Sequence, residues 1–142
     1  SSSAITRITD FKPQNLVNLA WAVARRALLD RPLLDAISAS AIPTIREFGA
    51  QHISNTSWSF AALSVCDSPL LNSLSSQAIR RIRDFGKQDL ANTAWALATL
   101  FVCDPPLLSA ISSEAITKIF ELQAQNLSNT AWAFSTRRIV DE

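Results

Sequence analysis

Few residues of this chain could act in catalysis. His52 is its single histidine, and the residues at the corresponding positions of a 37-residue period are Asn15, Asp89 and Asn126. These side chains share no acid–base chemistry, because an amide neither gains nor loses a proton at neutral pH. The sequence also contains no glycine-rich phosphate loop, nucleophile elbow or metal-ligand spacing. We therefore expect a protein that is not an enzyme, with no catalytic residue, metal, cofactor or small-molecule substrate.

The same four residues are better suited to recognition. A modular reader of single-stranded RNA keeps an invariant frame and varies one or two hydrogen-bonding side chains in each unit. Asn15, His52, Asp89 and Asn126 vary in this way, so they form a candidate recognition column. The alternative is that they are solvated polar residues near the ends of helices.

Basic residues form a second set of candidates. The net charge of +1 excludes a globally basic nucleic-acid binder but allows a local basic face. Contact with successive phosphates favours a basic residue at one repeated position, and two such positions are partly filled. The candidate basic contacts are Arg46, Arg81, Arg83 and Lys118. The alternative is a charged helix face that keeps the protein soluble.

The elements that must position these residues recur every 37 residues. Three residue types keep this step in all four units: the tryptophans Trp21, Trp58, Trp95 and Trp132, the asparagines Asn18, Asn55, Asn92 and Asn129, and the glutamines Gln14, Gln51, Gln88 and Gln125. Such a period is typical of stacked supersecondary units. We expect the tryptophans to be core spacers rather than platforms on which bases stack, and the asparagines to form a ladder of amides that bond to the backbone of neighbouring units. Both sets would then be structural framework.

Each unit is predicted to contain two helical segments. Apolar residues at steps of 3 and 4 predict a helix over about residues 14–29, and Asp30, Asp67 and Asp104 are predicted to cap the next helix. Pro43 and the Ser-rich step just before it (residues 37–40) predict a kink or a short break in that second helix, with serine capping its second half. The predicted fold is all-α: an α-solenoid of stacked 37-residue helical hairpins in one segment, 1–142, with units 1–29 (partial), 30–66, 67–103 and 104–140.

Three further expectations follow from the sequence. Cys66 and Cys103 occupy the same position of the period and are predicted to be buried free thiols, which suits a reducing compartment. The apolar runs are far too short to span a membrane. Residue 1 falls inside a unit, so we expect the chain to be a fragment of a longer repeat protein or an incompletely assigned subunit.

Two stretches carry a resemblance to a known family. Residues 88–100 read QDLANTAWALATL and are followed by DPPLL, while residues 11–24 read FKPQNLVNLAWAVA. Both resemble the octotricopeptide repeat, and the resemblance covers essentially the whole chain. It implies helical hairpins that bind single-stranded RNA in plastids or mitochondria. The unit here is one residue shorter than the usual 38 of that family.

Two functions remain open at this point. The first is binding of single-stranded RNA in organellar gene expression. The alternative is a structural subunit of a large organellar assembly, such as a photosystem or a ribosome, that contacts protein neighbours.

Overall fold

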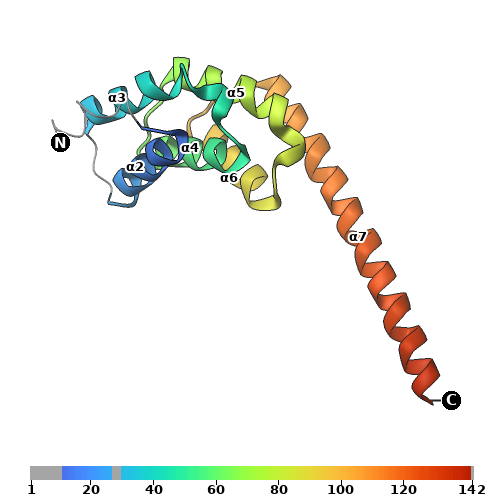
Figure 1. Cartoon of the computed structure of the whole chain (residues 1–142). Helices are drawn as coiled ribbons and strands as arrows, with labels where there is room; N and C mark the ends of the chain where they lie inside the picture. Colours follow the sequence, from blue (N-terminus) through green and yellow to red (C-terminus); the bar gives the residue numbers. More distant parts are fainter. Residues whose placement is uncertain (1–10, 27–29, 142) are drawn as a thin grey trace.

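The computed structural model describes residues 11–26 and 30–141, with the backbone alone for residues 126, 130 and 133–141. This part of the chain is helical and contains no strand. Its elements are α2 (Pro13–Arg25), α3 (Arg31–Ala41), η2 (Ile45–Glu47), α4 (Ala50–Ala62), α5 (Ser68–Arg81), η3 (Ile82–Asp84), α6 (Lys87–Thr99) and α7 (Pro105–Asp141). The all-α prediction is therefore confirmed (Figure 1).

The helices form two layers. Helices α2, α4 and α6 lie side by side in one layer, since α4 contacts both of the others. Helices α3, α5 and the first part of α7 form the second layer (Figure 1). The core lies between the layers and is made of aliphatic side chains with Phe48, Phe60 and Phe85, each exposed by 1% or less. The starts of α2, α4 and α6 are 37 residues apart, as are the starts of α3, α5 and α7.

The starts of the second-layer helices follow the prediction. The carboxylate Oδ1 atoms of Asp30, Asp67 and Asp104 accept hydrogen bonds from the backbone N–H groups three residues later, at 3.0, 3.1 and 3.1 Å. A proline follows each aspartate by two residues, within the first helical turn, where no backbone donor is needed. The predicted N-caps are thus confirmed.

The second helical segment of the first two full units is broken, as predicted, but the break lies just after the Ser-rich step and no serine caps the part that follows. Helices α3 and α5 run through their serines and end at Ala41 and Arg81. The chain turns a few residues later, through η2 and η3, where Phe48 and Phe85 adopt extended backbone and are fully buried. Burial of these two phenylalanines therefore fixes the turn after the second-layer helix, and no serine cap takes part in it.

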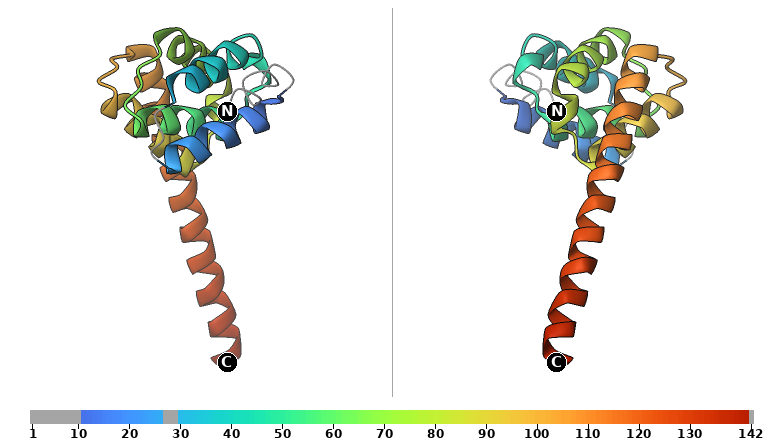
Figure 2. Two further views of the ribbon diagram at one scale, coloured as in Figure 1. Left: turned by 90° about the vertical axis from the view of Figure 1, so that its left-hand side faces the viewer. Right: turned by 90° about the vertical axis from the view of Figure 1, so that its right-hand side faces the viewer.

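Helix α7 does not turn at the corresponding place. It continues for 37 residues, and its C-terminal half extends beyond the other helices (Figures 1 and 2). Residues that would lie in the core of a further hairpin are exposed here, among them Leu122 at 39% and Leu127 at 72%. Among the described helices, none combines the length and the hydropathy needed to cross a membrane.

Two predicted burials are also wrong. Trp21 and Trp95 are 42% and 45% exposed, because their position faces away from the second layer. Cys66 and Cys103 are free, as predicted, but both are exposed, since each lies in the connection between two helices rather than inside one.

Candidate nucleic-acid interface

The first layer presents one polar and aromatic surface, which we call the amide–tryptophan face. On each helix it holds a glutamine, an asparagine four residues later and a tryptophan three residues after that, so the three side chains share one side of the helix. Its members are Gln14, Asn18 and Trp21 of α2, Gln51, Asn55 and Trp58 of α4, and Gln88, Asn92 and Trp95 of α6.

The amides of this face bond along their own helix. The Nε2 atom of Gln14 donates to Oδ1 of Asn18 at 2.7 Å, and Gln88 donates in the same way to Asn92 at 2.8 Å. The predicted bonds from Asn18 and Asn92 to the backbone of a neighbouring unit are wrong, because these side chains bond instead to the glutamine one turn earlier on their own helix.

The tryptophans supply aromatic surface. The rings of Trp58 and Trp95 stack across α4 and α6, with centroids 6.2 Å apart and planes inclined by 30°. The guanidinium of Arg25 lies 4.7 Å from the ring centroid of Trp21. Trp21 and Trp95 are exposed and Trp58 is half-buried. Exposed rings can stack with nucleic-acid bases, and an adjacent arginine adds a positive charge. The framework residues Asn129 and Trp132 lie on the projecting part of α7, with Trp132 71% exposed.

The candidate recognition column lies at the starts of the first-layer helices. Asn15, His52 and Asp89 each occupy the third position of their helix, and each accepts the backbone N–H of the residue before the helix, at 3.1, 3.1 and 3.0 Å. They therefore satisfy a donor that a helix start leaves unpaired. The side chain of Asn126 is outside the described residues. A role of the column in reading RNA stays a prediction.

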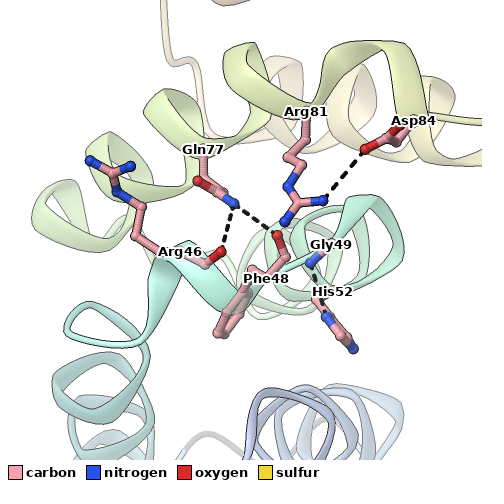
Figure 3. Close-up of polar contacts among 7 residues, drawn as sticks. All are labelled: Arg46, Phe48, Gly49, His52, Gln77, Arg81 and Asp84. Carbon is pink, nitrogen blue, oxygen red and sulfur yellow. Dashed lines mark hydrogen bonds and ion pairs between the residues drawn. The ribbon is translucent and has the colours of Figure 1, made fainter.

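His52 also links two helices. Its Nδ1 accepts from the Gly49 N–H, which assigns the proton to Nε2, and Nε2 lies 3.0 Å from Oε1 of Gln14 (Figure 3 shows the bond to Gly49). Burial lowers the pKa of His52 below 6.5, because the charged imidazolium loses hydration there. The neutral ring thus caps α4 and connects it to the amide–tryptophan face of α2.

Asp89 makes the equivalent connection one helix further on. Its Oδ1 accepts from the Ser54 hydroxyl at 2.9 Å while its Oδ2 accepts from the Gly86 N–H. Variation at this position therefore changes the chemistry of the cap and of the bond to the preceding helix.

Three of the four candidate basic contacts, Arg46, Arg81 and Arg83, lie near the turns that precede α4 and α6, whereas Lys118 lies within α7. Arg46 and Arg83 lie in η2 and η3 and are exposed. Arg81 lies 3.6 Å from the Asp84 carboxylate, and Lys118 lies 3.2 Å from Glu114 (Figure 3 shows Arg81). The structure brings Arg46, Arg81 and Arg83 to one edge, where the positive ends of the helix dipoles of α4 and α6 also lie.

One polar residue that the sequence did not single out is Gln77. It is 2% exposed, and its Nε2 donates to the carbonyl oxygens of Arg46 at 3.2 Å and Phe48 at 3.0 Å (Figure 3). Helix α5 thereby holds the turn of the preceding hairpin. Its equivalents, Ser40 and Glu114, differ in type, so the period contained no signal for this role.

A groove lies between α6 and α7. Its volume is about 410 Å³, and its floor is apolar, with Leu90 and Ala94 from α6 and Ile111, Ala115 and Ile119 from α7. Lys87 and Lys118 contribute the basic side chains of its lining. No group of three His, Cys, Asp or Glu side chains in the described part of the chain could hold a metal ion.

Comparison with known proteins identifies a family. The family model of the RNA-editing substrate-binding complex 6 protein matches residues 31–140, which is most of the chain. This match overturns the assignment to the octotricopeptide repeat, whose Trp-Ala and proline motifs are short enough to recur in an unrelated helical hairpin. No curated protein matches the chain.

Proposed function

Because the chain belongs to the family of the RNA-editing substrate-binding complex 6 protein, we propose that it is a non-catalytic subunit of an RNA-editing assembly that contacts single-stranded RNA. The observation that carries this proposal is the amide–tryptophan face, where the exposed Trp95 stacks on the half-buried Trp58 and the exposed amides of Gln51 and Gln88 lie on the same side of their helices. Stacking of a base on an aromatic side chain contributes roughly 1–3 kcal/mol and tolerates any sequence.

The charge distribution supports contact through a local surface. The net charge is only +1, so long-range attraction of RNA is weak. Arg25 lies over Trp21, and Arg46 and Arg83 lie exposed near the starts of α4 and α6, so positive charge is available at two margins of the face. Bases would stack on the tryptophans while phosphates contact these arginines.

The test is binding of a fluorescent pool of short single-stranded RNA over a range of salt concentrations. We expect affinity to fall as salt rises, and Trp95→Ala to weaken binding roughly 5- to 150-fold while Trp95→Phe largely retains it. Phe101→Ala is the matched control, since Phe101 is 95% exposed but lies outside the face. Absence of binding at low salt, or equal loss in the control, would contradict the proposal.

The recognition column can be tested in the same assay. His52→Asn and Asp89→Asn both provide an oxygen that can accept the capping N–H, as Asn15 does, but change the other hydrogen-bonding groups. We propose that these variants alter sequence preference; unchanged preference would remove the column as the reader.

A second candidate function is that of a scaffold that binds protein subunits. The observation that favours it is the apolar groove between α6 and α7, together with the exposed apolar residues of α7. Reconstitution with the other subunits of an RNA-editing substrate-binding complex tests it. When this chain is left out, we expect the complex not to assemble, while the other subunits still bind RNA.

We further propose that the hairpins form part of an α-solenoid. The 37-residue spacing of the helix starts and the side-by-side packing of α2, α4 and α6 support this architecture. The organellar location and the reducing compartment stay predictions.

A further inference from the structure

The α6–α7 groove occupies the place where one more first-layer helix would lie. The exposure of equivalent residues on the side of each first-layer helix that faces the next helix shows this. Val17 and Ser54 are 2% and 0% exposed because α4 and α6 cover them, whereas Ala91, the equivalent residue of α6, is exposed. Ala94 lies one turn further along the same side and lines the groove.

The chain contains a segment with the sequence of that missing helix. Residues 124–136 read AQNLSNTAWAFST, and they are identical to α6 (KQDLANTAWALAT) at 8 of 13 positions. The residue of this segment that corresponds to the buried Ile53 and Leu90 is Leu127, which is 72% exposed. The segment carries no charged residue, which suits an apolar groove.

Helix α7 holds this segment away from its own groove. Residues 115 and 130 are about 22 Å apart along a continuous helix, at 1.5 Å per residue. The views in Figures 1 and 2 show the distal half of α7 clear of α6. Gln123 and Leu122 stand where the earlier turns have glycine and phenylalanine, and both favour helix.

We propose that the α6–α7 groove binds residues 124–136 of a second copy of this chain, in a reciprocal exchange that forms a two-fold dimer. Each copy offers one groove and one segment, so two copies complete each other and leave neither unfilled. The exchange would cover Leu127 of one copy and Ala91 and Ala94 of the other, which places each in the environment that its equivalents already have.

Sedimentation equilibrium of the 142-residue chain tests the proposal, with a dimer of twice 15.5 kDa expected. Ala94→Arg blocks the groove and Leu127→Arg blocks the segment, so each variant alone should be monomeric with unchanged helical circular dichroism. Mixed in equal amounts they should form a heterodimer, because one intact groove then meets one intact segment. Phe101→Arg should leave the dimer intact, because Phe101 is 95% exposed and its equivalent in the preceding hairpin, Ser64, is exposed as well.

Two results would overturn the proposal. One is a wild-type chain that stays monomeric at all concentrations, which would mean that residues 124–136 of a second copy do not fill the groove. The other is a pair of blocked variants that fails to associate while Phe101→Arg still forms dimers. Neither result bears on RNA binding by the amide–tryptophan face, so this inference and the proposed function fail separately.

Discussion

Residues 82–86 and residues 119–123 occupy the same place in the 37-residue period, yet the chain turns at the first and continues as helix at the second. The first reads Ile-Arg-Asp-Phe-Gly and the second Ile-Phe-Glu-Leu-Gln. Phe85 is fully buried, whereas Leu122 is 39% exposed. The same position can thus serve as a turn or as the middle of a helix.

Local preference accounts for part of this difference. Glycine costs a helix roughly 1 kcal/mol relative to alanine, while leucine and glutamine are among the better helix formers. Gly86 itself has φ −79° and ψ 175°, an extended conformation open to any residue, and Lys12 takes a similar one before α2. Glycine therefore weakens the continuing helix more than it shapes the turn.

Packing by the next hairpin accounts for the rest. Helix α5 packs on η2, where Gln77 bonds two of its carbonyl groups, and α7 packs on η3. An isolated turn would leave backbone groups unpaired, whereas a continuous helix pairs them internally. The comparison teaches that the turn needs both a phenylalanine to bury and a following element to hold it.

The largest expected effect is a difference in stability between removing a phenylalanine from the turn and removing one from the helix. Phe85→Ala should lower the free energy of unfolding by about 3–5 kcal/mol, because it empties a fully buried site. Phe120→Ala should cost about 0.5 kcal/mol or less, since Phe120 is 66% exposed. Urea denaturation measures both, and similar costs for the two variants would show that the two regions are not packed differently.

A smaller effect is expected at the bond between hairpins. Gln77→Glu replaces the donor to two carbonyl groups with a carboxylate and should destabilise the protein by about 2–3 kcal/mol. The matched change in the next unit, Glu114→Gln, should cost under about 1 kcal/mol, because it removes only an ion pair with Lys118. Thermal unfolding of both variants checks this, and a harmless Gln77→Glu would mean that α5 does not hold the turn.

The sequence predicted those features that follow from the period itself. Helical hairpins, the aspartate caps and the spacing of the elements all depend on residues that recur in each unit, such as Asp30, Asp67 and Asp104. A period shows that equivalent residues share an environment, but it does not show which environment that is. The period alone therefore predicts tryptophans in the core, although Trp21 and Trp95 lie at the surface.

The features that the sequence did not predict depend on departures from the period. Gln77 has no equivalent of its own type, and the continuity of α7 results from Leu122 and Gln123 replacing phenylalanine and glycine. The candidate column stands out in the sequence because it varies, but its side chains accept from the backbone N–H three residues earlier, a bond that residue types alone do not reveal.

A still smaller effect tests the role of glycine in the comparison. Gln123→Gly should destabilise the middle of α7 by about 1 kcal/mol and speed amide exchange of residues 120–127 roughly fivefold. The reverse change, Gly86→Gln, should alter the free energy of unfolding by about 0.5 kcal/mol or less, since an added Cβ would lie 3.6 Å from its nearest neighbour. A loss of several kcal/mol for Gly86→Gln would show that glycine, rather than Phe85, makes the turn.

The smallest effect concerns the cap that follows the first turn, at His52. Its pKa is lowered below 6.5 in the folded protein by burial, so at pH values just below 6.5 the unfolded chain binds more protons than the folded one. The contribution of neutral His52 to stability is therefore complete above about pH 6.5 and decreases as the pH falls from there towards the folded pKa. Protonation would also place a hydrogen on Nδ1, which must accept the Gly49 N–H.

His52→Asn should keep the cap, as Asn15 does at α2, and abolish this pH dependence. Urea denaturation between pH 5.5 and 7.5 measures it (the range brackets the unperturbed value), and since His52 is the single histidine, a variant with the same pH profile as the wild type would exclude this cap as its source.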